Sequence, residues 1–428
     1  MIGLIVFCFV ILSILVLKNK KKHYLYLIFM YISMAPLIKL NNLVIDSSYL
    51  IMLFLVILIF INSKNHIIKL KISKNYFILI FLNFLLYFFS SFINNNFQMD
   101  TIKCATGFIK IPLCIFLIFS VFDFKTVKTD FYKYLRISVI LNILVCLFQM
   151  LTKDSYLEFF KILYSKGNDY YSFVSGKYAY SRTFGLFSSP VFLGNFSLFS
   201  LSSFLSNNDE KNKQKLLYII LTVLLGFLSA TKTFVFGMII IFFMLFLINI
   251  MVFITEKHIA KRKTMLIVVI FIFLLPLFYF LTSSVINLLA NNGVYIKYYL
   301  QFISSPFSAF ATRYGTSDNL LLAQTYKVIK EHLMIGVGFA SLNGEFIGDS
   351  TYVSALHNGG IISLITIIVF YLSHLIKNLK FKNKIALLLL TFIISGFGIP
   401  SLFNEYFLLP FLCYYFYEDY NSMESERG

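Results

Sequence analysis

The sequence predicts an all-α, polytopic integral membrane protein with about 12–13 transmembrane helices and two long external loops. Hydrophobic residues make up 59% of the 428 residues and charged residues only 13%, whereas a soluble globular protein carries about 25% charged residues. Apolar runs of the length that spans a bilayer, about 20 residues, recur along the chain. Most lysines stand in short turns between these runs, so we expect membrane-spanning helices joined by short, positively charged turns.

The expected spans follow the apolar runs in chain order. Twelve of them lie near residues 2–17, 24–38, 47–61, 76–93, 101–121, 137–151, 184–205, 216–230, 233–255, 264–281, 359–379 and 385–401. A further apolar run near residues 406–417 supplies a thirteenth. With thirteen spans the acidic tail over residues 418–428 lies inside the cell, and with twelve it lies outside.

Positive charge alternates between successive turns. The lysine-rich turns cover residues 18–22, 64–74, 125–136, 211–215, 257–263 and 377–384. By the positive-inside rule these turns are cytoplasmic, so both long loops and the N-terminus are expected outside. The formal net charge of +18 is then an orientation signal, and we expect no nucleic acid as a partner.

The predicted organisation has five parts. They are N-terminal transmembrane helices over 1–152, a first external loop over 153–183, central helices over 184–284, a large external loop with an amphipathic helix over 285–358, and C-terminal helices with a short tail over 359–428. The chain has no Gly-rich phosphate loop and no soluble catalytic domain, so any substrate arrives energised or moves passively. The five cysteines lie in apolar runs without a CxxC pair, which predicts no disulfide framework and no metal site.

The first external loop and the hairpin over 229–233 carry cations near the membrane border. Arg182 stands where the chain re-enters the membrane, and Lys232 lies in the hairpin. An arginine at that depth is costly unless it is paired or functional, and its planar fork suits a phosphate. The alternative is that both cations anchor the chain at lipid headgroups. Tyr178 and Tyr180 either stack on sugar rings or belong to the interfacial aromatic belt.

The second external loop holds a predicted amphipathic helix that follows Arg313. Ser317 or Asp318 is its expected N-cap, and Gly336 and Gly338 are expected to end it. Such a helix can lie on the membrane surface.

An acid and an imidazole come just before the span that follows this loop. On a helix, Asp349 and Tyr352 share a face that continues to His357. Either the acid or the imidazole is a candidate general base. The alternative is that Asp349 caps the helix and His357 satisfies a local hydrogen bond. Because Arg182 and Arg313 are also expected outside, we prefer the functional interpretation.

Five motifs, in this order, resemble the superfamily of O-antigen ligases and Wzy-type repeat-unit polymerases. They are residues 181–190 (SRTFGLFSSP), 230–233 (ATKT), 312–315 (TRYG), 332–339 (HLMIGVGF) and 349–360 (DSTYVSALHNGG), the last running into a span. The resemblance covers the chain from about residue 157 to the C-terminus. It implies a fold similar to the GT-C membrane glycosyltransferases and glycan substrates on polyprenyl pyrophosphate, without a metal, nucleotide or other cofactor.

The resemblance also implies roles for individual residues. The pyrophosphate would be held by Arg182 and Arg313, with Lys232 as a further contact. Asp349 or His357 would be the catalytic base. The rings that would contact the glycan are those of Tyr178, Tyr180, Tyr314 and Tyr352. Ligases of the family typically carry His-Asn about eleven residues before the Gly that opens the next span, whereas this chain has Asp349-Ser350 before Gly360; this departure favours the polymerase branch.

The expected function is therefore polymerisation of lipid-linked repeat units into O-antigen or capsular polysaccharide at the outer face of the cytoplasmic membrane. Its expected partners are the polyprenyl-pyrophosphate-linked oligosaccharides, membrane lipids, a chain-length-regulating co-polymerase and a flippase. A ligase that transfers a finished glycan to a lipid acceptor is the first alternative. A flippase or transporter is the second, with Lys103 and Lys110 as the charged residues that would line its path.

Overall fold

The computed structural model describes residues 24–34, 37–40, 43–62, 74–122, 124–152, 182–207, 212–255, 322–342, 344–345, 347, 350–380, 384–399 and 406–425. Within these residues it is mostly helical, with one antiparallel hairpin of β1 (Leu37–Leu40) and β2 (Leu43–Asp46) and irregular segments over 182–189 and 332–350. The expected spans near 2–17 and 264–281, and most of the two long loops, lie outside the described residues.

Five described helices are long and apolar enough to cross a membrane, which confirms the prediction of a multi-pass membrane protein. They are α4 (Lys74–Ile93), α5 (Met99–Val121), α6 (Phe124–Thr152), α11 (Lys232–Thr255) and α16 (Thr351–Lys380). The other helices are α2 (Leu25–Met34), α3 (Ser47–Asn62), α9 (Pro190–Ser206), α10 (Asn212–Leu228), α15 (Ala323–Glu331), α17 (Ala386–Ser395), the 3-10 turn η1 (Tyr406–Leu408) and α18 (Leu409–Ser425).

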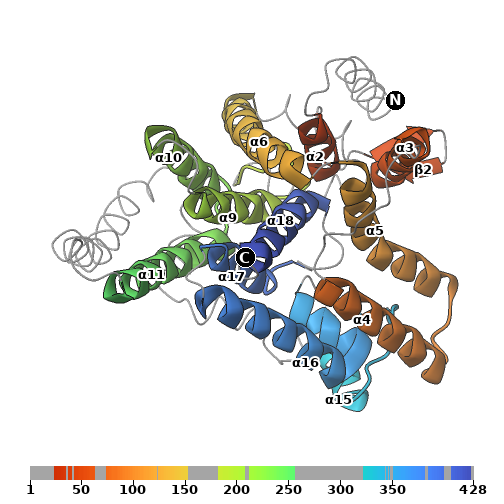
Figure 1. The fold of residues 1–428 in the computed structure, drawn as a ribbon. Helices are drawn as coiled ribbons and strands as arrows, with labels where there is room; N and C mark the ends of the chain where they lie inside the picture. The colour runs from red at the N-terminus through yellow and green to blue at the C-terminus, as the bar shows by residue number, and fades with distance from the viewer. Residues whose placement is uncertain are drawn as a thin grey trace.

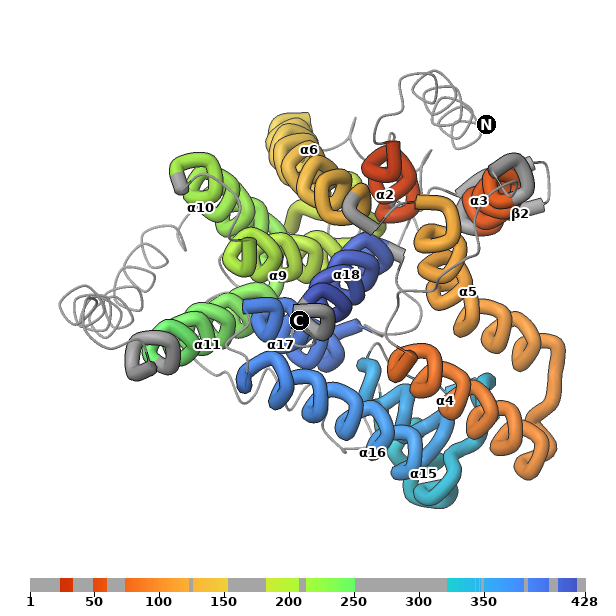
Figure 2. Tube along the Cα trace, in the orientation of Figure 1, coloured from red at the N-terminus to blue at the C-terminus, as the bar shows by residue number. Residues whose placement is uncertain are grey.

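The bundle is organised around α9 and α18 (Figure 1). Every residue of α9 from 193 to 205 is buried, and the helix packs against α10, α11 and α17. Several of its hydroxyl groups bond within the helix: Ser197 and Ser203, for example, donate to carbonyls one turn earlier at 2.8 Å. α2 and α18 pack against α6, while α4, α15 and α16 lie together on one side (Figure 2).

Aromatic rings supply much of the contact between these helices. Phe131 of α6 stacks on Tyr414 of α18 with ring centroids 4.4 Å apart. Phe199 of α9 meets Phe392 of α17 at 4.6 Å and Phe411 of α18 at 5.1 Å. Such pairs add to the burial of apolar area, so the high phenylalanine content serves the packing of α9 and α18.

The lysine-bearing ends of several helices meet at one end of the bundle. Lys377, near the end of α16, pairs with Asp419 near the end of α18 at 3.0 Å. Lys128, in the first turns of α6, lies 3.3 Å from Glu418. Lys215, near the start of α10, donates to carbonyls at the end of α9. Residues 418 and 419 of α18 therefore lie with the lysine-bearing ends.

Several helices begin or end at residues other than those that the apolar runs predict. α9 begins at Pro190 and not near 184, because Ser189 is its N-cap and accepts from the amide of Phe192 at 3.3 Å. α2 ends at Met34 and α17 at Ser395, both before the ends expected from hydropathy. α16 begins at Thr351, ahead of the expected 359, and bends at Gly360, where φ is 64° and ψ is −160°.

Candidate active site

Two groups of polar residues lie at the end of the helices opposite the lysine-bearing end. The first group consists of residues from the last turns of α6, from the segment that begins at Arg182, and from the turn between α10 and α11. The second gathers the end of α4, the segment between α15 and α16, and the first turns of α16. The first group is cationic and the second contains a buried carboxylate.

Arg182 is held in place by side chains and backbone of two neighbouring helices. The amide nitrogen of Gln149, in α6, donates to the Arg182 carbonyl at 3.1 Å, and its amide oxygen accepts from the amide of Phe184 at 3.0 Å. The Arg182 Nε donates to the carbonyl of Ser229 at 3.4 Å. The guanidinium is half-buried, so its position is defined before any ligand arrives.

The motif around Arg182 needs its glycine for a close approach. Gly185 has a φ of +57°, and a side chain there would run into Asn142 of α6. Asn142 is itself bonded, because its amide oxygen accepts from the amide of Leu186 at 2.9 Å. α6 therefore holds this segment through hydrogen bonds between the backbone and two buried side-chain amides, those of Gln149 and Asn142.

Lys232 begins α11 beside Arg182. The turn from α10 is only three residues long, with Ala230 at a φ of +48°, and the hydroxyls of Ser229 and Thr231 are 2.9 Å apart. Lys232 is half-buried and lies within electrostatic range of Arg182. Two cations at the positive end of a helix dipole favour an anion such as a phosphate.

His357 lies in the second group and is completely buried. Its Nε2 is 2.7 Å from Glu345 Oε1, and both side chains have an exposed fraction of zero. Its Nδ1 is 2.7 Å from the amide oxygen of Asn358. Because both ring nitrogens are hydrogen-bonded inside the protein, this imidazole does not face a substrate in this state.

The glycine-rich segment over 336–340 is fastened to the end of α4. Ser90 donates to the Gly336 carbonyl at 2.6 Å, and the Ser91 hydroxyl accepts from the amide of Phe339 at 3.0 Å. The Phe339 ring then packs against Tyr87 of the same helix, with centroids 5.4 Å apart. Gly336 has a φ of +66°, and a Cβ there would lie 2.5 Å from backbone atoms of α16.

A short turn after α17 connects the two groups. The carbonyl of Gly396 accepts from the amide of Thr351 at 2.8 Å and from the hydroxyl of Ser350 at 3.0 Å. Two residues further on, a Cβ on Gly398 would lie 3.3 Å from the hydroxyl of Thr233, which follows Lys232. The start of α16 and the start of α11 are thus neighbours across this turn.

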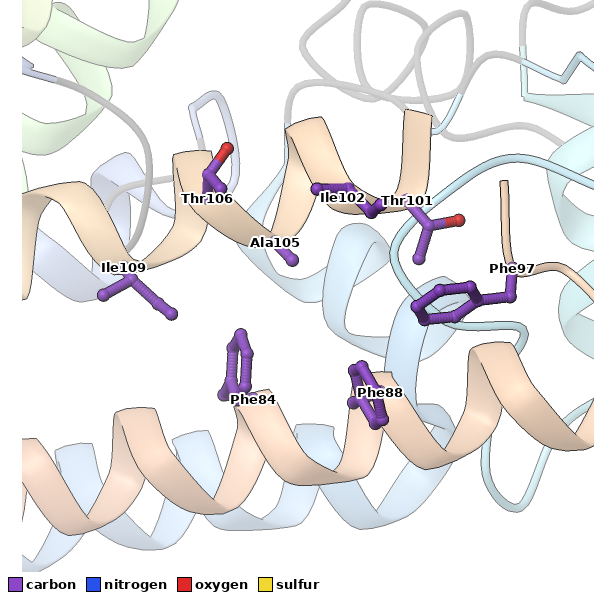
Figure 3. A pocket seen from close by; sticks show the side chains of 8 residues that line it. All are labelled: Phe84, Phe88, Phe97, Thr101, Ile102, Ala105, Thr106 and Ile109. Atoms are coloured by element: carbon purple, nitrogen blue, oxygen red, sulfur yellow. The ribbon is translucent and has the colours of Figure 1, made fainter. Parts of the chain in front are cut away.

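An apolar groove runs between α4 and α5 next to the second group (Figure 3). It has a volume of about 170 Å³ and is lined by Phe84, Phe88, Phe97, Thr101, Ile102, Ala105, Thr106 and Ile109. Phe84 and Phe88 point from α4 toward α5, and Phe97 stands at one end (Figure 3). Phe84 also packs against Phe339, with centroids 5.5 Å apart, so one wall of the groove is shared with the polar group.

Four of the site residues predicted from the sequence are described. Arg182 and Lys232 are brought together, and His357 lies in the other group. Tyr352 is half-buried, with its hydroxyl on the Ile393 carbonyl at 2.7 Å and its ring 4.7 Å from Phe397. The remaining candidates lie outside the described residues: Asp349, Arg313, Tyr178, Tyr180 and Tyr314.

The amphipathic helix of the second loop is present as α15, which begins at Ala323. The expected caps Ser317 and Asp318 lie outside the described part of the chain. Ala323 and Val328 of α15 are buried, whereas Leu333, just after the helix, is exposed. The helix ends at Glu331, several residues before the glycines expected to end it, because those glycines belong to the segment that is bonded to α4.

The two lysines considered for a transport path are accounted for locally. Lys103 is exposed and pairs with Asp100 at 2.8 Å on its own helix. The Lys110 ammonium lies over the ring of Tyr49, in α3, at 4.2 Å from its centroid, a cation–π contact. Neither position is that of a cation lining a central path.

Glu345, Gln149 and Asn142 belong to the site but were not predicted. Glu345 stands in an irregular segment without periodicity, and the two amides lie within apolar runs. A buried amide in a spanning helix carries a cost unless it is bonded, and this is the signal in the sequence that points to Gln149 and Asn142.

Comparison with known proteins gave no matching family model, no matching curated protein and no matching solved structure.

Proposed function

We propose that this protein is a repeat-unit polymerase of the Wzy type with a GT-C-like fold. It joins oligosaccharides carried on polyprenyl pyrophosphate into O-antigen or capsular polysaccharide. The proposal is supported by the five motifs in order along the chain and by the multi-pass helical architecture. It is a metal- and nucleotide-independent transferase, because the pyrophosphate bond of the donor supplies the free energy.

The observation that carries the proposal is the proximity of Arg182 and Lys232. The two cations lie within electrostatic range of each other near the start of α11, and both are half-buried. They come from different motifs, 50 residues apart in the sequence. A negatively charged group between two partly desolvated cations interacts favourably with both of them. A pyrophosphate linked to a lipid is such an anion, and it is presented at the membrane border.

The proposed reaction transfers a glycan from one lipid carrier to another. The growing chain on its polyprenyl pyrophosphate is the donor, and a single repeat unit on a second lipid is the acceptor. A base removes the proton of an acceptor hydroxyl, and the oxygen attacks the anomeric carbon of the donor. Of the two candidates, the His357 imidazole is enclosed by Glu345 and Asn358, so Asp349 is the proposed base. The bond from that carbon to the pyrophosphate breaks, and the leaving pyrophosphate keeps the electron pair. Arg182, Lys232 and Arg313 stabilise the negative charge that develops on it.

The lipid nature of both substrates fits the surroundings of the site. The proposed site lies opposite the lysine-bearing end, which the positive-inside rule assigns to the cytoplasm, so the reaction takes place at the outer face of the cytoplasmic membrane. The groove between α4 and α5 offers an apolar surface for a hydrocarbon chain. A flippase that delivers the repeat units and a co-polymerase that sets chain length are the proposed partners.

Deletion of the gene in its native host tests this function. The surface glycan is separated on a gel, and the lipid-linked pool is extracted alongside it. A polymerase predicts loss of the long ladder, with a single repeat left on its anchor. Long polymer that accumulates on polyprenyl pyrophosphate would identify the ligase alternative. Single repeats trapped at the cytoplasmic face would identify a flippase and overturn the proposal.

A further inference from the structure

A buried glutamine of α6 holds the backbone on both sides of Thr183. Gln149 lies near the end of the helix and is almost completely buried. Its amide nitrogen donates to the Arg182 carbonyl at 3.1 Å, and its amide oxygen accepts from the Phe184 amide at 3.0 Å. One side chain therefore supplies the pair of hydrogen bonds that a neighbouring strand makes to an extended segment.

The end of α10 holds the residue between these two contacts. The amide and the hydroxyl of Thr183 both donate to the Leu228 carbonyl, at 3.3 and 2.6 Å. The Arg182 Nε donates to the next carbonyl, that of Ser229, at 3.4 Å. Residues 182–184 are thus bonded to two helices through their backbone, and the place of the guanidinium depends on where this backbone is held.

The two backbone partners determine which way the Gln149 amide points. A carbonyl oxygen only accepts a hydrogen bond, and a backbone amide only donates one. Turning the side-chain amide over would place oxygen against oxygen at Arg182 and N–H against N–H at Phe184. Both contacts are made by the neutral amide of glutamine, so neither depends on the protonation state of a side chain.

The loss of this amide would displace Arg182. Backbone outside a helix is costly within a membrane unless its polar groups are bonded. An apolar side chain at position 149 would deprive the Arg182 carbonyl and the Phe184 amide of their bonds to α6. The segment would then move toward other partners. Lys232 is the first residue of α11, so this movement would change the position of Arg182 relative to Lys232.

We propose that Gln149 is a positioning residue: its side-chain amide holds the backbone on both sides of Thr183 and thereby fixes Arg182, relative to Lys232, where negative charge develops on the leaving pyrophosphate. Gln149 acts through Arg182. The role in turnover rests on the proposed function, whereas the hold on residues 182–184 does not.

Hydrogen exchange in the full-length protein in lipid nanodiscs tests the hold on this segment. Gln149→Met keeps the length and approximate volume of the side chain and removes both hydrogen bonds. Gln214→Met, on the exposed surface of α10, is the matched control. We expect the Phe184 amide to exchange about tenfold faster in Q149M and at the wild-type rate in Q214M. Peptides of the buried helix α9 show whether each variant is folded.

Turnover of a purified lipid-linked repeat unit by the same variants tests the role in catalysis. Displacement of Arg182 predicts a kcat lower by about 100-fold in Q149M, with the KM for the lipid-linked substrate within about twofold. Arg182→Ala and the double variant Gln149→Met/Arg182→Ala should have the same kcat, because Gln149 acts through Arg182. General damage to the fold would instead lower the kcat of the double variant further.

A milder substitution covers the case in which Q149M does not fold. Gln149→Asn keeps a neutral amide on a side chain that is one methylene shorter, so both hydrogen bonds are weakened. We expect the exchange rate of the Phe184 amide and the kcat of Q149N to lie between those of wild type and those predicted for Q149M.

The outcomes separate this inference from the proposed function. Wild-type exchange of the Phe184 amide in folded Q149M, an unchanged kcat, or a double variant less active than Arg182→Ala would overturn the role of Gln149. If Q149M does not fold, wild-type exchange or a wild-type kcat in Q149N would overturn it. If the wild-type protein makes no polymer from lipid-linked repeats, the proposed function fails, and the exchange rates still decide whether Gln149 holds residues 182–184.

Discussion

The two ends of the helix bundle use charge in different ways. At the lysine-bearing end, cations are matched by acids from another helix: Lys377 by Asp419 at 3.0 Å and Lys128 by Glu418 at 3.3 Å. At the opposite end, Arg182 and Lys232 are brought beside each other. Ion pairs between helices hold them together, whereas two cations near the start of a helix favour the binding of an anion. We therefore assign stability to the first end and ligand binding to the second.

The comparison predicts that changes at the lysine-bearing end affect folding more than turnover. Asp419 is completely buried, and Asp419→Asn removes the counter-charge of Lys377. Breaking one partner of a buried ion pair costs about 3–5 kcal/mol. Asp100→Asn is the control, because its pair with Lys103 is exposed on both sides and is worth about 0–1 kcal/mol. In detergent, Asp419→Asn should unfold at a lower temperature than Asp100→Asn. The turnover per folded molecule should be the same for the two variants.

Changes to the two cations at the opposite end should affect turnover and leave folding intact. Arg182→Ala removes a charge that stabilises the leaving pyrophosphate, so we expect a loss of about 10²–10³ in kcat. Lys103→Ala, a change of an exposed cation, is the control and should keep wild-type turnover. Full-length polymer from Arg182→Ala, at a normal level of the protein, would contradict the assignment of this end.

The glycines of the second polar group give a third contrast, between sites of similar backbone conformation. Gly336 and Gly344 both have a positive φ, but only Gly336 has backbone atoms 2.5 Å from a would-be Cβ. We expect Gly336→Ala to cost about 3 kcal/mol of stability and Gly344→Ala about 1 kcal/mol. Chemical unfolding of both variants measures the free energy of unfolding that each substitution removes. Equal losses of stability would show that segment 336–340 does not pack closely against α16.

The smallest effect is expected in the groove between α4 and α5. Ala105→Phe fills part of its volume of about 170 Å³. If the groove holds a hydrocarbon chain of the substrate, the KM for the lipid-linked repeat should rise by about tenfold at an unchanged kcat. Leu113→Phe, at an exposed position of the same helix away from the groove, should leave the KM unchanged. Equal KM values for the two variants would remove the groove from the substrate path.

The sequence predicts the two ends unequally well. Hydropathy and the spacing of lysines are enough to predict the spans and the lysine-bearing end, because these signals lie in short stretches of the sequence. Arg182 and Lys232 stand out for the same reason, as cations at a membrane border. The contact between Glu345 and His357 depends on the bend at Gly360 and on the register of segment 336–340 against α16. No periodicity encodes that register, so a sequence alone does not reveal why His357 is enclosed.

The most direct test of the account is reconstitution of the purified protein in lipid nanodiscs with a labelled polyprenyl-pyrophosphate-linked repeat unit and nothing else. The account predicts a ladder of polymer on the lipid carrier without metal or nucleotide, abolished by Arg182→Ala and retained by Asp419→Asn in proportion to the folded fraction. The absence of a ladder from folded wild-type protein, or a ladder that persists in Arg182→Ala, would contradict it.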